Sequence, residues 1–298
     1  MTPWINVHER FTGTSGAILL AVGACAIFAT MHALVRHVSA GLHPFEIAFF
    51  RSLFGLAAVL PLAWKIGLTV FVSRNPRLLA LRGLMGGMSL LTWFYGLSVV
   101  PIAIATVLSF TSVMFSSLGA SIILKERMRV RRWTAVALGF AGVVIIVRPG
   151  LSAIDAGALV ILFAAMLWGG GTVLVKHISR TDETVTIVMW TAIWLTLATA
   201  IPAWTVWQAP SWPQISWLVL IGILGTAGTY AWTFALKNAE ASLIVPVDFS
   251  RLVWAAAIGF IAFGEVPDRY MWIGAALIIG STAYIGWRES KLAREGSL

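Results

Sequence analysis

The hexapeptide Leu-Val-Arg-His-Val-Ser at residues 34–39 has a near copy, Leu-Val-Lys-His-Ile-Ser, at residues 174–179. Each copy ends an apolar run long enough to cross a membrane, which takes about 20 residues. Four further pairs match at an offset of 139: Trp93 with Trp232, Phe110 with Phe249, Glu126 with Glu265, and Trp133 with Trp272. The chain is therefore predicted to hold two copies of one unit, residues 1–150 and residues 151–298.

The apolar runs predict ten membrane helices, five in each half. They are Gly16–Val38, Phe45–Trp64, Leu78–Val99, Ile102–Leu124, Trp133–Val147, Ala156–Val175, Val185–Trp204, Ser216–Leu236, Ser242–Gly264 and Met271–Trp287. Because five is odd, the second unit must enter the membrane from the opposite side. We expect an all-α polytopic membrane protein built from two inverted five-helix repeats, a plan that recurs among secondary transporters.

The composition excludes several other classes of protein. Only 11% of the residues are charged, against about 25% in soluble domains, and 59% are hydrophobic. The net charge of +9 comes from basic residues in short gaps between apolar runs, so it does not indicate nucleic-acid binding. Cys25 is the only cysteine, which excludes an intrachain disulfide, and we read it as a small packing residue. We expect neither a metal nor a cofactor.

Basic residues set the expected orientation. If the N-terminus is cytoplasmic, the inner segments hold 16 Lys and Arg residues and the outer segments hold three, Arg36, Arg148 and Arg269. This bias predicts both termini in the cytoplasm of a bacterial inner-membrane protein.

The motifs resemble those of the drug/metabolite transporter superfamily, EamA branch. Leu167-Trp168-Gly169-Gly170 opens the second half, and Lys125-Glu126 and Gly264-Glu265 end the fourth helix of each half, followed by Trp133 and Trp272. Two departures are Ile27–Met31 in place of a Trp-Gly motif and Thr111-Ser112 where many relatives carry proline. Within the branch, the overall similarity is greatest to aromatic amino-acid exporters of the YddG type.

Charged residues inside membrane helices are costly, by roughly 2.5–3.5 kcal/mol at the centre, and so are candidates for a site. Asp248 and Arg251 lie three residues apart on one helix face, and they either neutralise each other or bind the ammonium and carboxylate of a substrate. Asp248 could also carry a coupling proton. Arg51 either extends to the membrane surface or binds a carboxylate. His32 is either a packed histidine or a proton relay.

Aromatic residues inside the helices could wall a substrate cavity or simply face lipid. We include Trp93, Tyr95, Trp168, Tyr230 and Trp254 as candidate substrate-binding residues. Gly86, Gly87, Gly169, Gly170 and Gly171 allow either close static packing or bending during transport. For Glu126, beside Arg127 and Arg129, and for Glu265, near Arg269, we expect structural or gating contacts.

Together these features predict a secondary transporter that exports amino acids, aromatic ones above all, by alternating access through a central cavity. The alternative is a transporter of another small metabolite or drug, such as a nucleoside or vitamin. An intramembrane enzyme is disfavoured because the five histidines show no catalytic or metal-binding spacing. The expected partners are the small-molecule substrate and the lipid bilayer, with the protein as a monomer.

Overall fold

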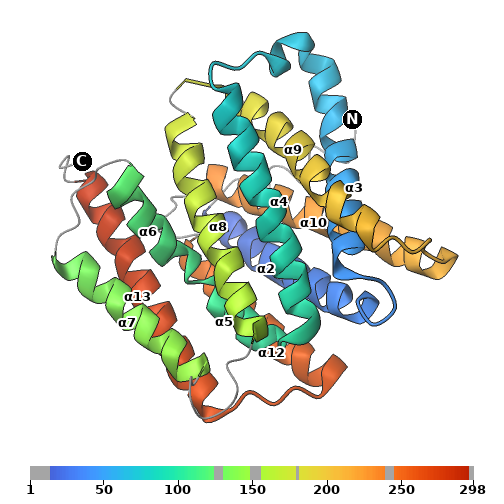
Figure 1. The fold of residues 1–298 in the computed structure, drawn as a ribbon. Coiled ribbons are helices and arrows are strands. Elements are labelled where there is room, and N and C mark those ends of the chain that lie inside the picture. Colours follow the sequence, from blue (N-terminus) through green and yellow to red (C-terminus); the bar gives the residue numbers. More distant parts are fainter. Residues whose placement is uncertain (1–13, 124–129, 148–155, 179–180, 239–244, 295–298) are drawn as a thin grey trace.

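A computed structural model describes residues 14–123, 130–147, 156–178, 181–238 and 245–294 (Figure 1). Within these residues the chain forms helices and connecting turns, without strands, which confirms the all-α fold. The first half holds α2 (Thr14–Val38), α3 (Pro44–Ile66), η1 (Leu68–Phe71), α4 (Pro76–Val99), α5 (Ile102–Ser109), α6 (Ser112–Ile123) and α7 (Val130–Val147). The second half holds α8 (Ala156–Ile178), α9 (Thr184–Thr205), α10 (Trp212–Asn238), η2 (Val245–Phe249), α12 (Ser250–Phe263) and α13 (Arg269–Arg294).

Six of the described spans are long and apolar enough to cross a membrane, and α7 is a shorter apolar helix. The fourth predicted run differs from expectation, because it divides into α5 and α6 at Phe110 and Thr111. The amides of both residues bond three positions back, to Val107 and Leu108, and the Thr111 hydroxyl also donates to the Leu108 carbonyl at 2.6 Å. Such side-chain bonds compete with regular helix bonding. The ninth run divides likewise, into η2 and α12 after Phe249.

Corresponding helices of the two halves make corresponding contacts. Helix α2 packs against α10 and α12, and its counterpart α8 packs against α4 and α6. Two further pairs join counterparts directly: α3 with α9, and α7 with α13 (Figure 1). This pattern is that of two similar units related by an approximate two-fold axis, and most large helix contacts join one half to the other.

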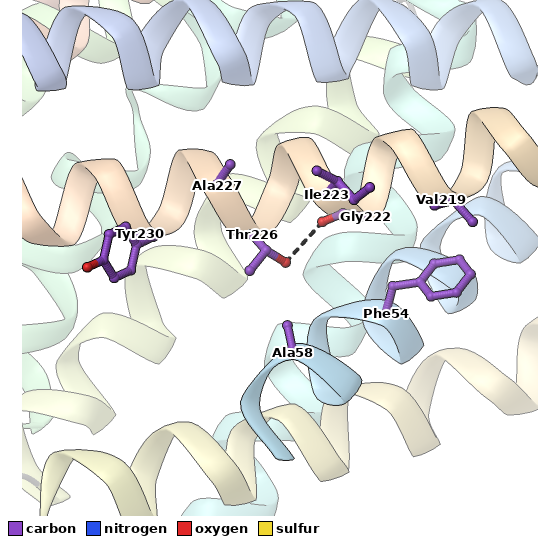
Figure 2. Close-up of a pocket in the computed structure, with 8 residues that line it drawn as sticks. All are labelled: Phe54, Ala58, Val219, Gly222, Ile223, Thr226, Ala227 and Tyr230. Atoms are coloured by element: carbon purple, nitrogen blue, oxygen red, sulfur yellow. Dashed lines mark hydrogen bonds between the residues drawn. The ribbon is translucent and has the colours of Figure 1, made fainter. Parts of the chain in front are cut away.

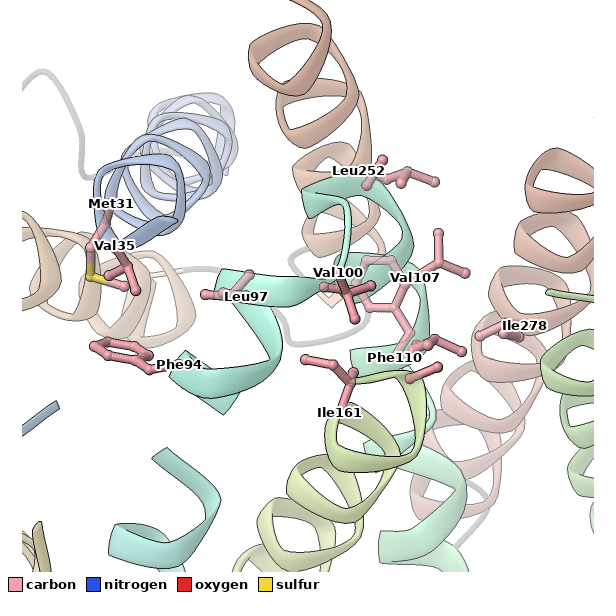
Figure 3. Close-up of a cluster of buried hydrophobic side chains, with 14 of the residues drawn as sticks. Met31, Val35, Phe94, Leu97, Val100, Val107, Phe110, Ile161, Leu252 and Ile278 are labelled. Atoms are coloured by element: carbon pink, nitrogen blue, oxygen red, sulfur yellow. The ribbon is translucent and has the colours of Figure 1, made fainter. Parts of the chain in front are cut away.

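The largest apolar cluster lies where helices of both halves meet. Figure 3 shows Phe94 and Leu97 of α4, Ile161 of α8, Leu252 of α12 and Ile278 of α13 in this cluster. All five side chains are at most 4% exposed. The packed interior therefore depends on both repeats together.

The helix glycines allow close approach between neighbouring helices. A Cβ on Gly87 of α4 would lie 2.5 Å from the Cβ of Ala198 in α9, and one on Gly169 of α8 would overlap the Ser112 carbonyl oxygen. A Cβ on Gly170 or Gly171 of α8 would lie 3.0 Å or 3.2 Å from the Met85 or Arg82 side chain of α4, and one on Gly86 of α4 would lie 3.4 Å from the Leu195 side chain of α9. The structure thus supports the packing role of these glycines, and their bending role stays a prediction.

Candidate functional site

The two helix breaks meet inside the bundle. Phe110 and Phe249 occupy corresponding positions in the two repeats, and their rings make an edge-to-face contact with centroids 5.1 Å apart. Corresponding residues can touch in this way only close to the axis that relates the repeats. Interrupted membrane helices are where transporters commonly place their substrate sites.

Helices α2 and α4 contribute His32 and Trp93 to this region. The indole Nε1 of Trp93 donates to Nε2 of His32 at 3.4 Å, and the rings meet edge to face at 5.2 Å. Because Nε2 accepts this bond, the proton of a neutral His32 must be on Nδ1. That Nδ1 atom is buried and has no hydrogen-bond partner. His32 therefore carries a donor that nothing in the described part of the protein satisfies.

Asp248 of η2 and Arg251 of α12 form an ion pair where the two helices join. The Nη2 of Arg251 lies 3.1 Å from Oδ2 of Asp248, and its guanidinium lies 5.4 Å from the centroid of Phe110. The Nε of Arg251 is buried without a partner. The pairing expected from the sequence is present, yet the Arg251 and Asp248 side chains keep 20% and 28% of their surface accessible. Cys25, which is buried, has its thiol 3.9 Å from Asp248.

Arg51 comes to the same region from α3. Protein atoms surround its side chain densely, and it packs over Gly225 of α10, where an added Cβ would lie 3.4 Å from Nε. It nevertheless keeps some accessible surface. Among the described residues, no carboxylate lies within ion-pair distance of Arg51. Met31, the neighbour of His32 in α2, packs over the same glycine, with its sulfur 3.1 Å from that Cβ position.

Four other predicted aromatic residues are more exposed. Tyr95, Trp168, Tyr230 and Trp254 are 40%, 53%, 67% and 39% exposed, and their place in a substrate site stays a prediction. The indole of Trp168 packs instead with the Arg82 guanidinium, 5.7 Å away. We therefore define the central cluster as the five predicted residues that the structure brings together with the phenylalanine pair: His32, Arg51, Trp93, Asp248 and Arg251.

A second ion pair lies at the end of the bundle where α2 and α12 end. Arg36 lies 3.0 Å from Glu265, and Glu265 accepts the backbone N–H of Ile102 at 2.9 Å. Arg36 also donates to the Val100 carbonyl. Glu265 was expected near Arg269, but the structure pairs it with Arg36, which sequence spacing alone could not reveal. We call these contacts the Arg36–Glu265 latch; the corresponding Glu126 lies outside the described residues.

The opposite end of the bundle joins the loop before α4 to the loop before α9. The Asp182 carboxylate accepts the Arg74 N–H at 2.9 Å and the Asn75 amide at 2.8 Å. Burial raises the pKa of Asp182, but hydrogen bonds from Ser73, Asn75, Arg74 and Thr181 outweigh this effect and leave the pKa below its usual 3.8. The carboxylate is therefore held in its charged form.

A groove between α3 and α10 has a volume of about 500 Å³ (Figure 2). Its lining is almost wholly apolar and includes Phe54, Ile223 and Tyr230. The hydroxyl of Thr226 already donates to the Gly222 carbonyl at 2.9 Å. Such a surface suits lipid chains better than a polar metabolite. The described residues also hold no group of three or more His, Cys, Asp or Glu that could bind a metal.

Comparison with known families resolves the class of protein. The model of the EamA-like transporter family matches this chain twice, over residues 15–148 and residues 155–287. The chain belongs to this family. The two matches to one family model explain the repeated hexapeptide and the paired helix breaks, and this EamA-like protein is a multi-pass membrane protein.

Its relatives within the family are named for several cargoes. A riboflavin transporter of Rhizobium johnstonii is 30% identical, with 83% of this chain and 82% of the relative covered. An S-adenosylmethionine uptake transporter of Rickettsia prowazekii is 29% identical, with 86% of this chain and 87% of the relative covered. A pseudopaline exporter of Pseudomonas aeruginosa is 30% identical, with 88% of this chain and 93% of the relative covered. A crystal structure with 20% identity covers 93% of this EamA-like chain and 99% of its own, with a TM-score of 0.61, which supports the fold.

Proposed function

We propose that this protein is a secondary transporter that moves a small organic metabolite across a bacterial inner membrane by alternating access. Because the two halves, residues 1–150 and 151–298, are interleaved, groups of helices drawn from both halves would move against each other around the central cluster. The observation that carries the proposal is the contact between Phe110 and Phe249, because it joins the interrupted helix of one repeat to that of the other. Motion of either half must therefore alter the surroundings of the cluster.

The names of the relatives favour another small metabolite as the substrate, which was the alternative expectation, over amino acids, which were the first. Their names give a vitamin, a sulfonium nucleoside and pseudopaline, and none of the three relatives compared above is named for amino acids. We accordingly withdraw amino acids as the preferred substrate and propose another small metabolite. Because the names include both uptake and export, they also leave the direction open. All three are transporters, which favours transport over the enzyme hypothesis.

The central cluster is the proposed substrate site. Its side chains come from α2, α3 and α4 of the first half and from η2 and α12 of the second, so it contacts both halves at once. The unpartnered Nδ1 of His32 and Nε of Arg251 offer directed hydrogen bonds. The rings of Trp93 and Phe110 offer apolar contact to a planar group. A pocket with a few directed polar groups in an apolar wall is the usual form of a small-molecule site.

Purified protein reconstituted alone in liposomes tests the proposal. Counterflow of labelled riboflavin and S-adenosylmethionine would be measured beside a mixture of amino acids, with and without a proton gradient. We expect uptake of at least one of the two metabolite probes or of an added nucleoside panel, and its loss in Arg251→Gln. The matched control Arg269→Gln changes an exposed arginine outside the cluster and should retain uptake. Inert liposomes with folded protein would reject the transport proposal, and chemical turnover of a probe would favour an enzyme.

A further inference from the structure

Two buried polar atoms of the central cluster lack a hydrogen-bond partner among the described residues, and both are donors. They are Nδ1 of His32 and Nε of Arg251. A buried donor without an acceptor is unfavourable. A ligand that places an acceptor atom beside such a donor therefore gains a hydrogen bond that the protein alone does not make. Acceptors shared by several donors are typical of a carboxylate or phosphate oxygen.

The charges of the cluster do not balance. Asp248 is paired with Arg251 at 3.1 Å, and the hydrogen bond from Trp93 is made to the neutral form of His32. Arg51 is left as a full positive charge for which the described residues supply no carboxylate. An arginine held in place without a protein partner, deep between helices, is best matched by a negative charge on the ligand.

The neighbouring surface is aromatic and apolar. Phe110 lies against Arg251 and Phe249, and Met31 of α2 contacts the same region of Gly225 as Arg51 does. A ligand that places an anionic group on Arg51 would therefore place its remaining atoms against rings and apolar side chains. This arrangement selects for an anion with a flat or apolar body rather than for a small hydrated anion.

From these three observations we infer that the central cluster binds an organic anion, with a carboxylate or phosphate on Arg51 and a planar body beside Phe110 and Phe249. The inference rests on the proposed transport function, since it names the substrate class of the same site. It differs from the amino-acid site expected from the sequence because the Asp248 carboxylate is already paired with Arg251, which leaves Arg51 as the unbalanced charge of the cluster.

Binding can be tested apart from transport, with matched pairs of ligands. Thermal stabilisation of the detergent-purified full-length protein would be measured with indole-3-acetate and its neutral amide, with other aromatic acid–amide pairs, and with phenyl phosphate beside phenol. We expect the acid of at least one pair to bind roughly 10- to 100-fold more tightly than its amide, as charge-assisted bonds predict. Phenyl phosphate against the carboxylates distinguishes the two oxyanions.

Variants then assign the preference to a residue. Arg51→Gln should reduce the preference for acid over amide to less than about 3-fold, while Arg51→Lys, which keeps the charge, should retain part of it. Arg82→Gln removes another intramembrane arginine, one that lies outside the cluster against Trp168, and should leave the preference unchanged. The inference is overturned if no acid is preferred over its amide, or if Arg51→Gln keeps the full preference in folded protein. Transport of neutral probes alone would overturn it while leaving the proposed function intact.

Discussion

Phe110 and Phe249 are the same position of the repeat, and their rings touch at 5.1 Å across the boundary between the halves. Each phenylalanine lies where its own membrane segment is interrupted, so the contact joins two interrupted segments. An aromatic pair of this geometry contributes about 0.5–1.5 kcal/mol beyond the area it buries. The contact therefore joins the interrupted segments of the two repeats where they meet inside the bundle.

A double-mutant cycle measures this coupling. Phe110→Leu and Phe249→Leu each keep an apolar side chain but remove the ring. We expect the effects of the two substitutions on the free energy of unfolding to be non-additive by about 0.5–1.5 kcal/mol. Full additivity would show that the ring contact carries no energy. The pair Phe115 and Phe140, which also contact edge to face but lie outside the central cluster, serves as a reference cycle.

Breaking the Arg36–Glu265 latch should open the end of the bundle that it holds. Glu265→Gln removes the ion pair and leaves Arg36 with the Val100 carbonyl, at a cost of about 1–2 kcal/mol for a partly buried pair. This cost shifts an opening equilibrium roughly 5- to 30-fold. The readout is modification of Ala33→Cys by a water-soluble thiol reagent in a Cys25→Ala background, since Ala33 is 7% exposed and lies one turn before Arg36. Unchanged labelling would show that the latch does not control access.

The close glycine contacts predict a loss of stability when a methyl group is added. In Gly169→Ala the new Cβ meets the backbone at Ser112 and Ser116, which cannot move as a side chain can. We expect a loss of about 1–3 kcal/mol and a Tm several degrees lower. Gly23→Ala, in α2 with nothing within 4 Å of the new Cβ, is the matched control and should leave Tm unchanged or slightly raised. Equal effects of both substitutions would contradict the packing interpretation.

The Asp182 contacts predict a dependence of stability on pH. The pKa of this carboxyl lies below 3.8 in the folded protein, so its contribution is complete above about pH 4 and is lost as the pH falls through the lowered pKa. Asp182→Asn should lower Tm at neutral pH, and the difference from the wild type should shrink below about pH 4. Glu183→Gln, at the exposed neighbouring position, should show no such difference. A difference that is constant at all pH values would exclude the charged hydrogen bonds as its source.

The repeat and the apolar runs were sufficient to predict the fold, because membrane helices are long and their pattern is local. The interruption at Phe110 was missed, since the shift of the Phe110 and Thr111 amides to acceptors three residues back leaves no mark in the hydropathy pattern. Sequence reasoning selected Asp248, Arg251, Arg51, His32 and Trp93 because polar residues are rare in membrane helices. It could not tell that Tyr230 and Trp254 are more exposed than these five, because the exposure of a side chain depends on which helices pack against it. The ion pair of Arg36 with Glu265 could not be predicted for the same reason, because it depends on which helices pack side by side.

The interleaved packing of the halves also bears on how the protein is made. Helix α2 has its largest contacts with α10 and α12, which the ribosome delivers long after it. During synthesis, the first five segments enter the bilayer before their partners exist. Until then, lipid or an insertion chaperone must cover the helix faces that later contact the second half. If residues 1–150 and 151–298 are produced as two separate polypeptides, each should be short-lived alone and persist when both are present in the same cell.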